Sequence, residues 1–279
     1  MNFFTPAECI QNYMGTGEGK CKNKPLKVFV LAILAGIFIG YGAASSTTAA
    51  HAITNVGLAR LVSGAVFPVG LIMVILMGAE LFTGDCLIAI SVLGGRVKVG
   101  AMIKTLVIVY IGNFVGSIIL ALIVANAGAL NYSSGALAAN VVKIAVGKCS
   151  LSFGNALLSG ILCNIIVCMA VIMAAAGKSV GCKILATYFP ILAFVTAGFE
   201  HSVANMYYIT VALFANAMPK YAEAIVAAGV DTTALTWGNL FVKNLIPVTI
   251  GNIIGGVFIG FMLWYGHSKK AEKAAAKKK

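Results

Sequence analysis

Long apolar runs separated by short polar segments make up the chain from residue 27 to residue 265. Each run is near the roughly 20 residues that a helix needs to cross a bilayer core. The pattern therefore predicts an all-α membrane protein with six spans, at residues 27–49, 61–93, 104–127, 155–176, 184–215 and 244–265. No long polar insert divides these runs, so residues 27–265 are predicted to form a single transmembrane domain.

The second and fifth runs are too long for one straight crossing, and polar residues interrupt both of them. The interruptions are predicted near residues 80–85 and 198–205, where Glu80 and Glu200 each follow a glycine by two positions. Each run is therefore predicted to be two half-helices joined by non-helical backbone, which a membrane tolerates only beside protein or a wet cavity. Because ionisable groups at membrane depth mark functional sites, a solute pathway is expected between the two breaks.

The two halves of the chain share three short patterns in the same order. They are Ala35-Gly36-Ile37 with Ser159-Gly160-Ile161, Gly78-x-Glu80 with Gly198-x-Glu200, and Gly112-Asn113-x-x-Gly116 with Gly251-Asn252-x-x-Gly255. A repeat of three spans is odd-numbered, so the second copy must start from the opposite side of the membrane. The sequence thus predicts two inverted three-helix repeats.

Composition supports the membrane class and excludes several others. With 60% hydrophobic residues, 10% charged residues and a mean hydropathy of +0.98, the chain cannot fold as a soluble domain. The net charge is +12, but the basic residues lie between the spans and at the chain ends, and no aromatic residues alternate with them. Nucleic acid is therefore not an expected partner. The seven cysteines show no paired C-x-x-C spacing, and no metal, disulfide or cofactor is expected.

The basic residues also predict the orientation of the chain. With a cytoplasmic N-terminus, fifteen Lys and Arg residues lie on the cytoplasmic side and five on the other. Both termini are therefore expected in the cytoplasm, with residues 266–279 forming a basic tail. Residues 1–26 are expected to form a short amphipathic helix over 5–14, with Thr5 as N-cap and Pro6 in the first turn, and then a linker at 15–24.

His201 is the leading candidate for contact with a solute. It is one of three histidines and the one expected at membrane depth, where it would offer a titratable donor; a buried neutral histidine bonded to a hydroxyl is the alternative. Thr83 is expected to meet it across the two breaks. Glu80 and Glu200 are expected to shape the loops by capping backbone N–H groups rather than to touch solute.

Several other positions carry two open interpretations. Apolar side chains could ring a narrow pore or simply pack, namely Leu71, Leu81, Phe82, Phe194 and Phe199. Asn164 and Asn252 could link helices or line the pore. Lys148 could draw anions into a vestibule or act only as a topology charge.

Three segments resemble the signature segments of the formate/nitrite transporter family: residues 78–83, 198–206 and 247–256. The resemblance covers roughly residues 5–265. It implies a homopentamer of six-span protomers with an aquaporin-like fold, in a bacterial or archaeal inner membrane, passing formate, nitrite or hydrosulfide. Matched motif by motif, it assigns the central pore histidine to His201, the loop threonine to Thr83, the constriction to Leu71, Leu81, Phe82 and Phe194, the pore asparagines to Asn164 and Asn252, and the vestibule lysine to Lys148.

The resulting hypothesis is a channel for small monovalent anions of weak acids. Hydrosulfide is favoured, because the chain is most similar in appearance to the hydrosulfide channels of the family. A formate channel or a proton-coupled formate/nitrite transporter is the alternative, and an aquaporin-like pore for neutral solutes is a distant one, since no Asn-Pro-Ala pair occurs. An enzyme is not expected, since no nucleophile stands beside a base. In this hypothesis Lys148 concentrates the anion, apolar rings remove its water, and His201 donates a hydrogen bond or transiently protonates it.

Overall fold

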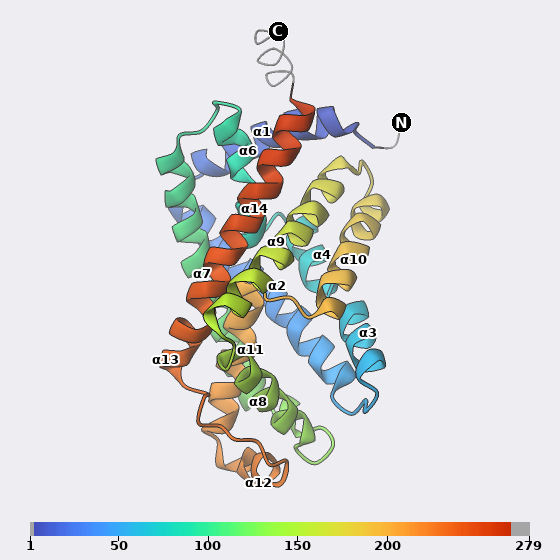
Figure 1. The fold of residues 1–279 in the computed structure, drawn as a ribbon, viewed down its shortest axis with the longest axis vertical. Coiled ribbons are helices and arrows are strands. Elements are labelled where there is room, and N and C mark those ends of the chain that lie inside the picture. Colours follow the sequence, from blue (N-terminus) through green and yellow to red (C-terminus); the bar gives the residue numbers. More distant parts are fainter. Residues whose placement is uncertain (1–2, 269–279) are drawn as a thin grey trace.

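The computed structural model describes residues 3–268, and its regular elements are helices (Figure 1). Their bounds are α1 Pro6–Lys22, α2 Pro25–Ala50, α3 Val56–Val66, α4 Val69–Met77, α5 Phe82–Asp85, α6 Ile88–Leu93, α7 Val99–Asn126, α8 Ala136–Cys149, α9 Phe153–Ala176, α10 Val180–Ala197, α11 Ser202–Asn216, α12 Pro219–Ala227, α13 Trp237–Asn239 and α14 Ile246–His267. A short 3₁₀ turn, Ala129–Asn131, precedes α8, and a π-helical segment, Leu240–Leu245, leads into α14.

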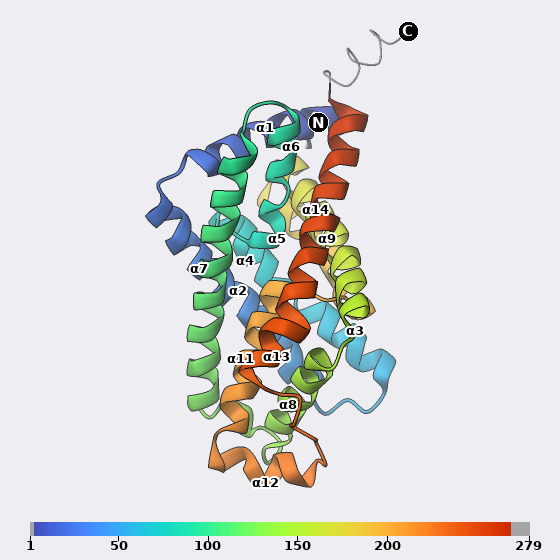
Figure 2. The ribbon, with the colours of Figure 1, turned by 60° about the vertical axis from the view of Figure 1, so that its left-hand side comes forward.

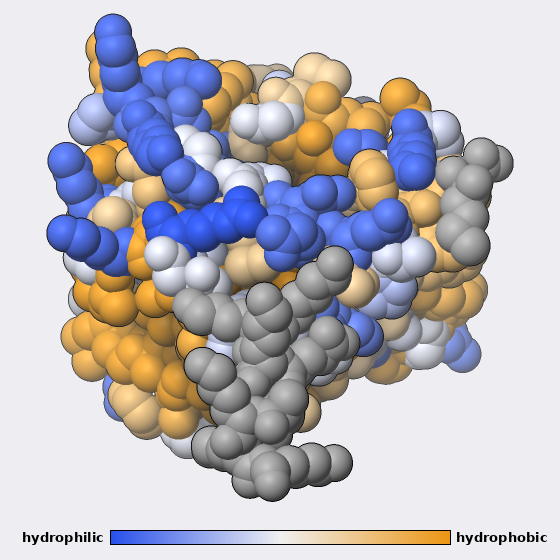
Figure 3. Space-filling view, turned by 90° about the horizontal axis from the view of Figure 1, so that it is seen from above, coloured by the Kyte–Doolittle hydropathy of each residue, from blue (hydrophilic) through white to orange (hydrophobic). Residues whose placement is uncertain are grey.

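Six helical segments are long and apolar enough to cross a membrane, which agrees with the predicted number. They are Pro25–Ala50, Val56–Met77, Val99–Asn126, Phe153–Ala176, Val180–Ala197 and Trp237–His267. Large apolar side chains such as Val107 and Ile111 are exposed on their outer faces. Hydrophilic residues instead gather over the end of the molecule that carries α1 (Figure 3). The protein is therefore a multi-pass membrane protein. The predicted basic tail lies outside the described residues from position 269 onward.

Both predicted breaks are present, and each begins at a glycine. α4 ends at Gly78 with φ +66°, and α10 ends at Gly198 with φ +78°, in the left-handed region that glycine adopts without a Cβ penalty. The chain then runs extended to Leu81 and His201, after which α5 and α11 begin. The first break thus covers residues 78–81 and the second residues 198–201, shorter than predicted, because helix resumes at once.

The N-terminal helix is longer than the sequence suggested. Thr5 is its N-cap, in a reciprocal capping box with Glu8, and Pro6 stands in the first turn as predicted. The backbone N–H of Thr5 and then its hydroxyl hold the pKa of Glu8 below its usual value. However, the predicted linker at 15–24 is mostly helix, because Gly17 packs its backbone against Ser91 of α6. Figure 2 shows α1 lying across the end of the molecule beside α6.

Two helices longer than a single turn, α8 and α12, were not predicted at all. Both lie at the end of the molecule opposite α1 (Figures 1 and 2). α8 buries one face, which includes Leu137 and Val141, in the core that it shares with α11. Its apolar stretch is too short to be predicted as a membrane span. The helical spacing of its apolar residues produces a buried face only because α11 packs beside it.

The spanning helices approach closely through glycine, as the small residues in the sequence suggested. α2 crosses α7 where a Cβ added to Gly116 would collide with the backbone carbonyl of Ile33. α9 crosses α14 where a Cβ added to Gly255 would collide with the carbonyl of Ile161. Such backbone contacts cannot relax by a change of rotamer, so these two crossings need glycine.

Gly116→Val is therefore expected to destabilise the protein. Overpacking costs about 1–3 kcal/mol or more where the neighbour cannot move, so thermal unfolding in detergent is expected to fall by about 5–10 °C. Gly100→Val is the matched control on the same helix, because no atom of another packed element lies within 4 Å of a Cβ there. Equal unfolding temperatures for the two variants would contradict the close-crossing interpretation.

Candidate functional site

The two breaks meet at a hydrogen bond between Thr83 and His201. The Thr83 hydroxyl oxygen lies 2.9 Å from His201 Nε2, although the residues are 118 positions apart. Both side chains are buried. The contact that the sequence predicted across the breaks is present.

The other ring nitrogen of His201 determines which atom carries the hydrogen. The backbone N–H of Ala204 donates to His201 Nδ1 at 3.0 Å, which makes His201 the N-cap of α11. Since Nδ1 accepts, the neutral ring carries its hydrogen on Nε2 and donates it to the Thr83 oxygen. The hydroxyl hydrogen of Thr83 is then left for a third group. The sequence missed the capping role because histidine is not among the favoured N-cap residues.

A cavity lies on each side of this contact. The first, of about 620 Å³, reaches His201, Phe194 and Lys148, and is called here the Lys148 vestibule. The second, of about 530 Å³, reaches Leu71 and Leu81 and is covered by α1; it is called the α1 vestibule. The Thr83–His201 contact thus separates two spaces that open toward opposite ends of the molecule.

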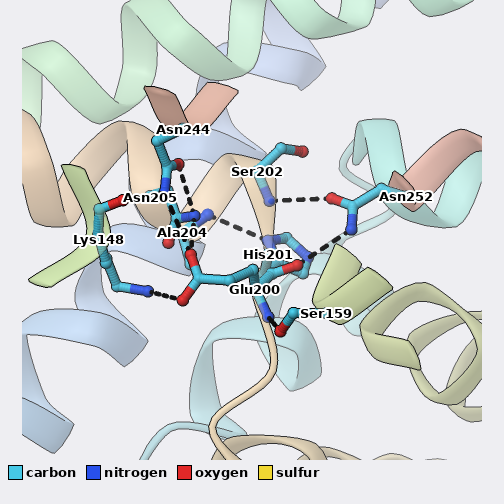
Figure 4. Close-up of polar contacts among 9 residues, drawn as sticks. All are labelled: Lys148, Ser159, Glu200, His201, Ser202, Ala204, Asn205, Asn244 and Asn252. Carbon is cyan, nitrogen blue, oxygen red and sulfur yellow. Dashed lines mark hydrogen bonds and ion pairs between the residues drawn. The ribbon is translucent and has the colours of Figure 1, made fainter. Parts of the chain in front are cut away.

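Lys148 does not stand free in its vestibule. Its ammonium lies 2.8 Å from Glu200 Oε1 (Figure 4). The amides of Asn205 and Asn244 donate to Glu200 Oε2 at 2.6 and 3.3 Å. α8, α11 and the segment before α14 are thereby tied to the second break. The sequence did not single out Asn205 or Asn244, although both are polar residues in largely apolar surroundings.

The first break is held by a comparable ion pair from α1. Lys20 binds the Glu80 carboxylate and lies 2.9 Å from Asp85 Oδ1. Burial lowers the pKa of Lys20, but Asp85 and Glu80 outweigh burial and raise it, so Lys20 stays cationic. The expected capping of backbone N–H groups is not how these glutamates act: the described contacts of the Glu80 and Glu200 carboxylates are to side chains.

One asparagine fastens each break to the third span of its half. Asn252 accepts from the Ser202 N–H at 2.9 Å and donates to the Glu200 carbonyl at 3.1 Å (Figure 4). Asn113 accepts from the Phe82 N–H at 2.9 Å and donates to the Glu80 carbonyl, also at 2.9 Å. Asn113 was quoted in the sequence repeat but not as a site residue.

Asn164 completes the support behind the contact. Its amide donates to the carbonyl oxygens of Thr83, at 3.1 Å, and Asn252, at 2.6 Å. Both asparagines are fully buried, and neither is among the described lining residues of the two vestibules. Of the two interpretations left open by the sequence, the geometry favours the link between helices over the lining of a pore.

The apolar candidates divide between the two sides. The Phe194 ring packs edge-on against Phe67 with centroids 5.7 Å apart, and lies 6.0 Å from the His201 ring. Leu71 and Leu81 line the α1 vestibule. Phe82 instead packs against Tyr110, with ring centroids 4.8 Å apart, and is not among the described lining residues of either vestibule.

The sequence profile described as "Formate/nitrite transporter" matches residues 7–265 of the chain. The protein belongs to the formate/nitrite transporter family. Among its relatives, the formate channel FocA of Escherichia coli K12 is 38% identical over 264 residues, which is 93% of each chain. A probable formate transporter of Methanothermobacter thermautotrophicus is 35% identical over 288 residues, 96% of this chain and 99% of its own.

Solved structures agree with this assignment. A pentameric formate channel with formate bound matches with a TM-score of 0.77 and 35% identity, over 86% of this chain and 96% of its own. An ion channel of the formate/nitrite transporter family matches with a TM-score of 0.80 and 29% identity, over 93% and 98% of the two chains. The family consists of channels and transporters, so this protein is not an enzyme. The preference for hydrosulfide finds no support here, because the two sequence relatives and the pentameric channel are named for formate.

Proposed function

We propose that this member of the formate/nitrite transporter family is a channel for small monovalent anions of weak acids, with formate as the first candidate. The observation that carries the proposal is the Thr83–His201 donor pair, buried where two broken helices meet and flanked by a vestibule on each side. The names of the relatives favour formate. Hydrosulfide and nitrite are kept as related permeants.

The donor pair suits an anion that has lost its water. Leaving a charge unpaired in an apolar constriction costs several kcal/mol, which donors placed at that point offset. The Thr83 hydroxyl hydrogen is one such donor, and the Nε2–H of His201 becomes the second when an arriving anion replaces the Thr83 oxygen as its acceptor. The apolar side chains of Phe194 and Leu81, on either side of the pair, would exclude hydrated ions.

The hydrogen bonds of His201 also bear on the protonation step. Neutral His201 carries a hydrogen on Nε2 alone, because Nδ1 accepts from Ala204. Donating that hydrogen fully to an anion would leave an imidazolate, which is far more basic than formate. We therefore assign His201 the role of a fixed hydrogen-bond donor, and any proton that travels with the anion is drawn from water in a vestibule.

We further propose that the two halves are inverted repeats. Matching contacts support this: Asn113 and Asn252 fasten the two breaks in the same way. The carbonyls of Ile33 and Ile161 lie against Gly116 and Gly255. The sequence patterns had paired Gly36 of the first span with Gly160. The pairing of Ile33 with Ile161 shifts this correspondence by one helical turn, so that Gly36 corresponds to Asn164. The Asn113 and Asn252 contacts pair Phe82 with Ser202 and so set Leu81 opposite His201, which means that the donor belongs to one half alone.

The assembly and orientation are likewise proposals. The matching solved structure is described as a pentamer, and exposed apolar side chains on the spans, such as Ile111, could face either lipid or neighbouring protomers. We propose a homopentamer in the inner membrane of a bacterium or archaeon, with a pore in each protomer. Both termini are placed in the cytoplasm, so that residues 1–26 lie at the cytoplasmic mouth and the Lys148 vestibule opens outward.

A selectivity series in proteoliposomes tests the function. Flux of formate, nitrite and hydrosulfide is expected to exceed that of chloride, because the anion of a weak acid can take up a proton from vestibule water and lose its charge at the constriction, whereas chloride cannot. At a fixed concentration of formate anion, the flux between about pH 6 and pH 8 is not expected to follow a histidine titration.

Three outcomes would redirect the proposal. Chloride flux equal to formate flux would remove weak-acid anions as the permeant class. Water or glycerol flux above all anion fluxes would establish the neutral-solute pore. Reversal potentials that follow the proton gradient as well as the anion gradient would make the protein a proton-coupled transporter.

A further inference from the structure

The Lys148 vestibule holds more positive than negative charge. Its charged lining residues are Arg60, Lys143, Lys148 and Glu200. Lys148 and Glu200 neutralise each other in their ion pair. Arg60 and Lys143 have no carboxylate partner within residues 3–268. Two uncompensated cations therefore face the space that leads to His201.

Arg60 is held close to the second break. It projects from α3, and its Nη1 lies 3.5 Å from the carbonyl oxygen of Thr196, near the end of α10. A Cβ added to Gly198 would collide with the same nitrogen. The negative end of the α10 dipole favours a cation at this place. Only one of the five guanidinium N–H groups makes a described hydrogen bond, and that bond is long, so the others are left for water or an anion.

The α1 vestibule has no such excess. Its charged lining residues are Lys20, Lys183, Glu80 and Asp85, two of each sign. Lys20 is shared between both carboxylates. The two vestibules therefore differ in net charge.

We propose that Arg60, assisted by Lys143, is the anion-capture group of the Lys148 vestibule, and that Lys148 has a structural role instead. The inference rests on the proposed anion-channel function. Cations lining a narrow mouth raise the local concentration of anions there, and salt screens the effect. Current carried by anions that enter through this vestibule should therefore depend on Arg60 at low ionic strength.

Arg60→Gln tests the proposal in planar bilayers of neutral lipid, with formate as the current carrier. At about 10 mM salt, where the Debye length is about 30 Å, current driven inward from the Lys148 vestibule is expected to fall about two- to four-fold. At about 1 M salt, where the Debye length is about 3 Å, the difference is expected to vanish. Arg60→Lys keeps the charge and should retain the current. Lys220→Gln is the matched control, since Lys220 is exposed and lines neither vestibule.

A cysteine variant assigns the side and restores the charge. In Arg60→Cys channels carrying Cys182→Ser, which removes an exposed thiol, a cationic methanethiosulfonate reagent added to one chamber should recover the low-salt current. An anionic reagent should lower it further.

The outcomes separate this proposal from the function on which it rests. Unchanged low-salt current in Arg60→Gln, or an equal loss at both salt concentrations, would overturn the capture role. Absence of formate current in the unsubstituted protein would instead overturn the proposed function.

Discussion

Glu200→Gln is expected to lower the unfolding temperature by about 10 °C. The substitution leaves the ammonium of Lys148 without its counter-charge, and the side chains of the pair are only 16% and 9% exposed. Breaking one side of a buried ion pair costs about 3–5 kcal/mol, and about 1 kcal/mol shifts the unfolding temperature by about 2–4 °C in a chain of this size. Thermal unfolding in detergent, followed by tryptophan fluorescence, measures the effect.

Two matched variants show whether the loss comes from the unpaired charge. Glu18→Gln breaks the Glu18–Lys22 pair, whose side chains are 32% and 73% exposed, so solvent screens the pair and little stability is expected to depend on it. It should unfold within about 2 °C of the unsubstituted protein. Adding Lys148→Met to Glu200→Gln removes the stranded charge and should recover part of the stability. If Glu200→Gln alone unfolds normally, Lys148 is not tied down and regains the role of anion attractor.

His201→Asn is expected to lower formate flux about 10- to 100-fold while leaving the fold in place. Asparagine is a favoured N-cap residue and can accept from the Ala204 N–H as His201 Nδ1 does. It is too short to reproduce the Nε2–H at the position facing Thr83. A lost hydrogen bond to a charged group costs about 1.5–3 kcal/mol, and each 1.4 kcal/mol is about tenfold. Proteoliposome flux, measured beside thermal unfolding, provides both readouts.

Companion variants separate the donor from the cap. His201→Leu loses both functions, so it should lose flux and also about 1 kcal/mol of stability. Thr83→Ser keeps the hydroxyl and should retain most of the flux, whereas Thr83→Val should lose it. Normal flux in His201→Asn would show that the anion does not depend on the Nε2 donor.

The sequence by itself determined the number of spans, the two breaks and the N-cap at Thr5. These features depend on local chemistry: about 20 apolar residues cross a bilayer, and an apolar run much longer than that is expected to break where glycine and polar groups stand within it. The family followed for the same reason, because the segments around Glu80 and Glu200 are contiguous in the chain. Local chemistry also explains the failures at α8 and α12, whose short amphipathic stretches acquire a buried face only against other helices.

Tertiary structure decided what the side chains at the centre do. From the sequence, Lys148 could be interpreted as an anion attractor, but its ammonium forms an ion pair with Glu200, 52 positions away. His201 was identified as a donor, yet the hydrogen on Nε2 follows from Ala204 and Thr83 lying on its two sides. Arg60 is only one of several basic residues between the spans in the sequence, and its place against Gly198 follows from the packing of α3 on α10. Helix packing determines which of these side chains come into contact. The hydropathy pattern along the chain carries no information about such contacts.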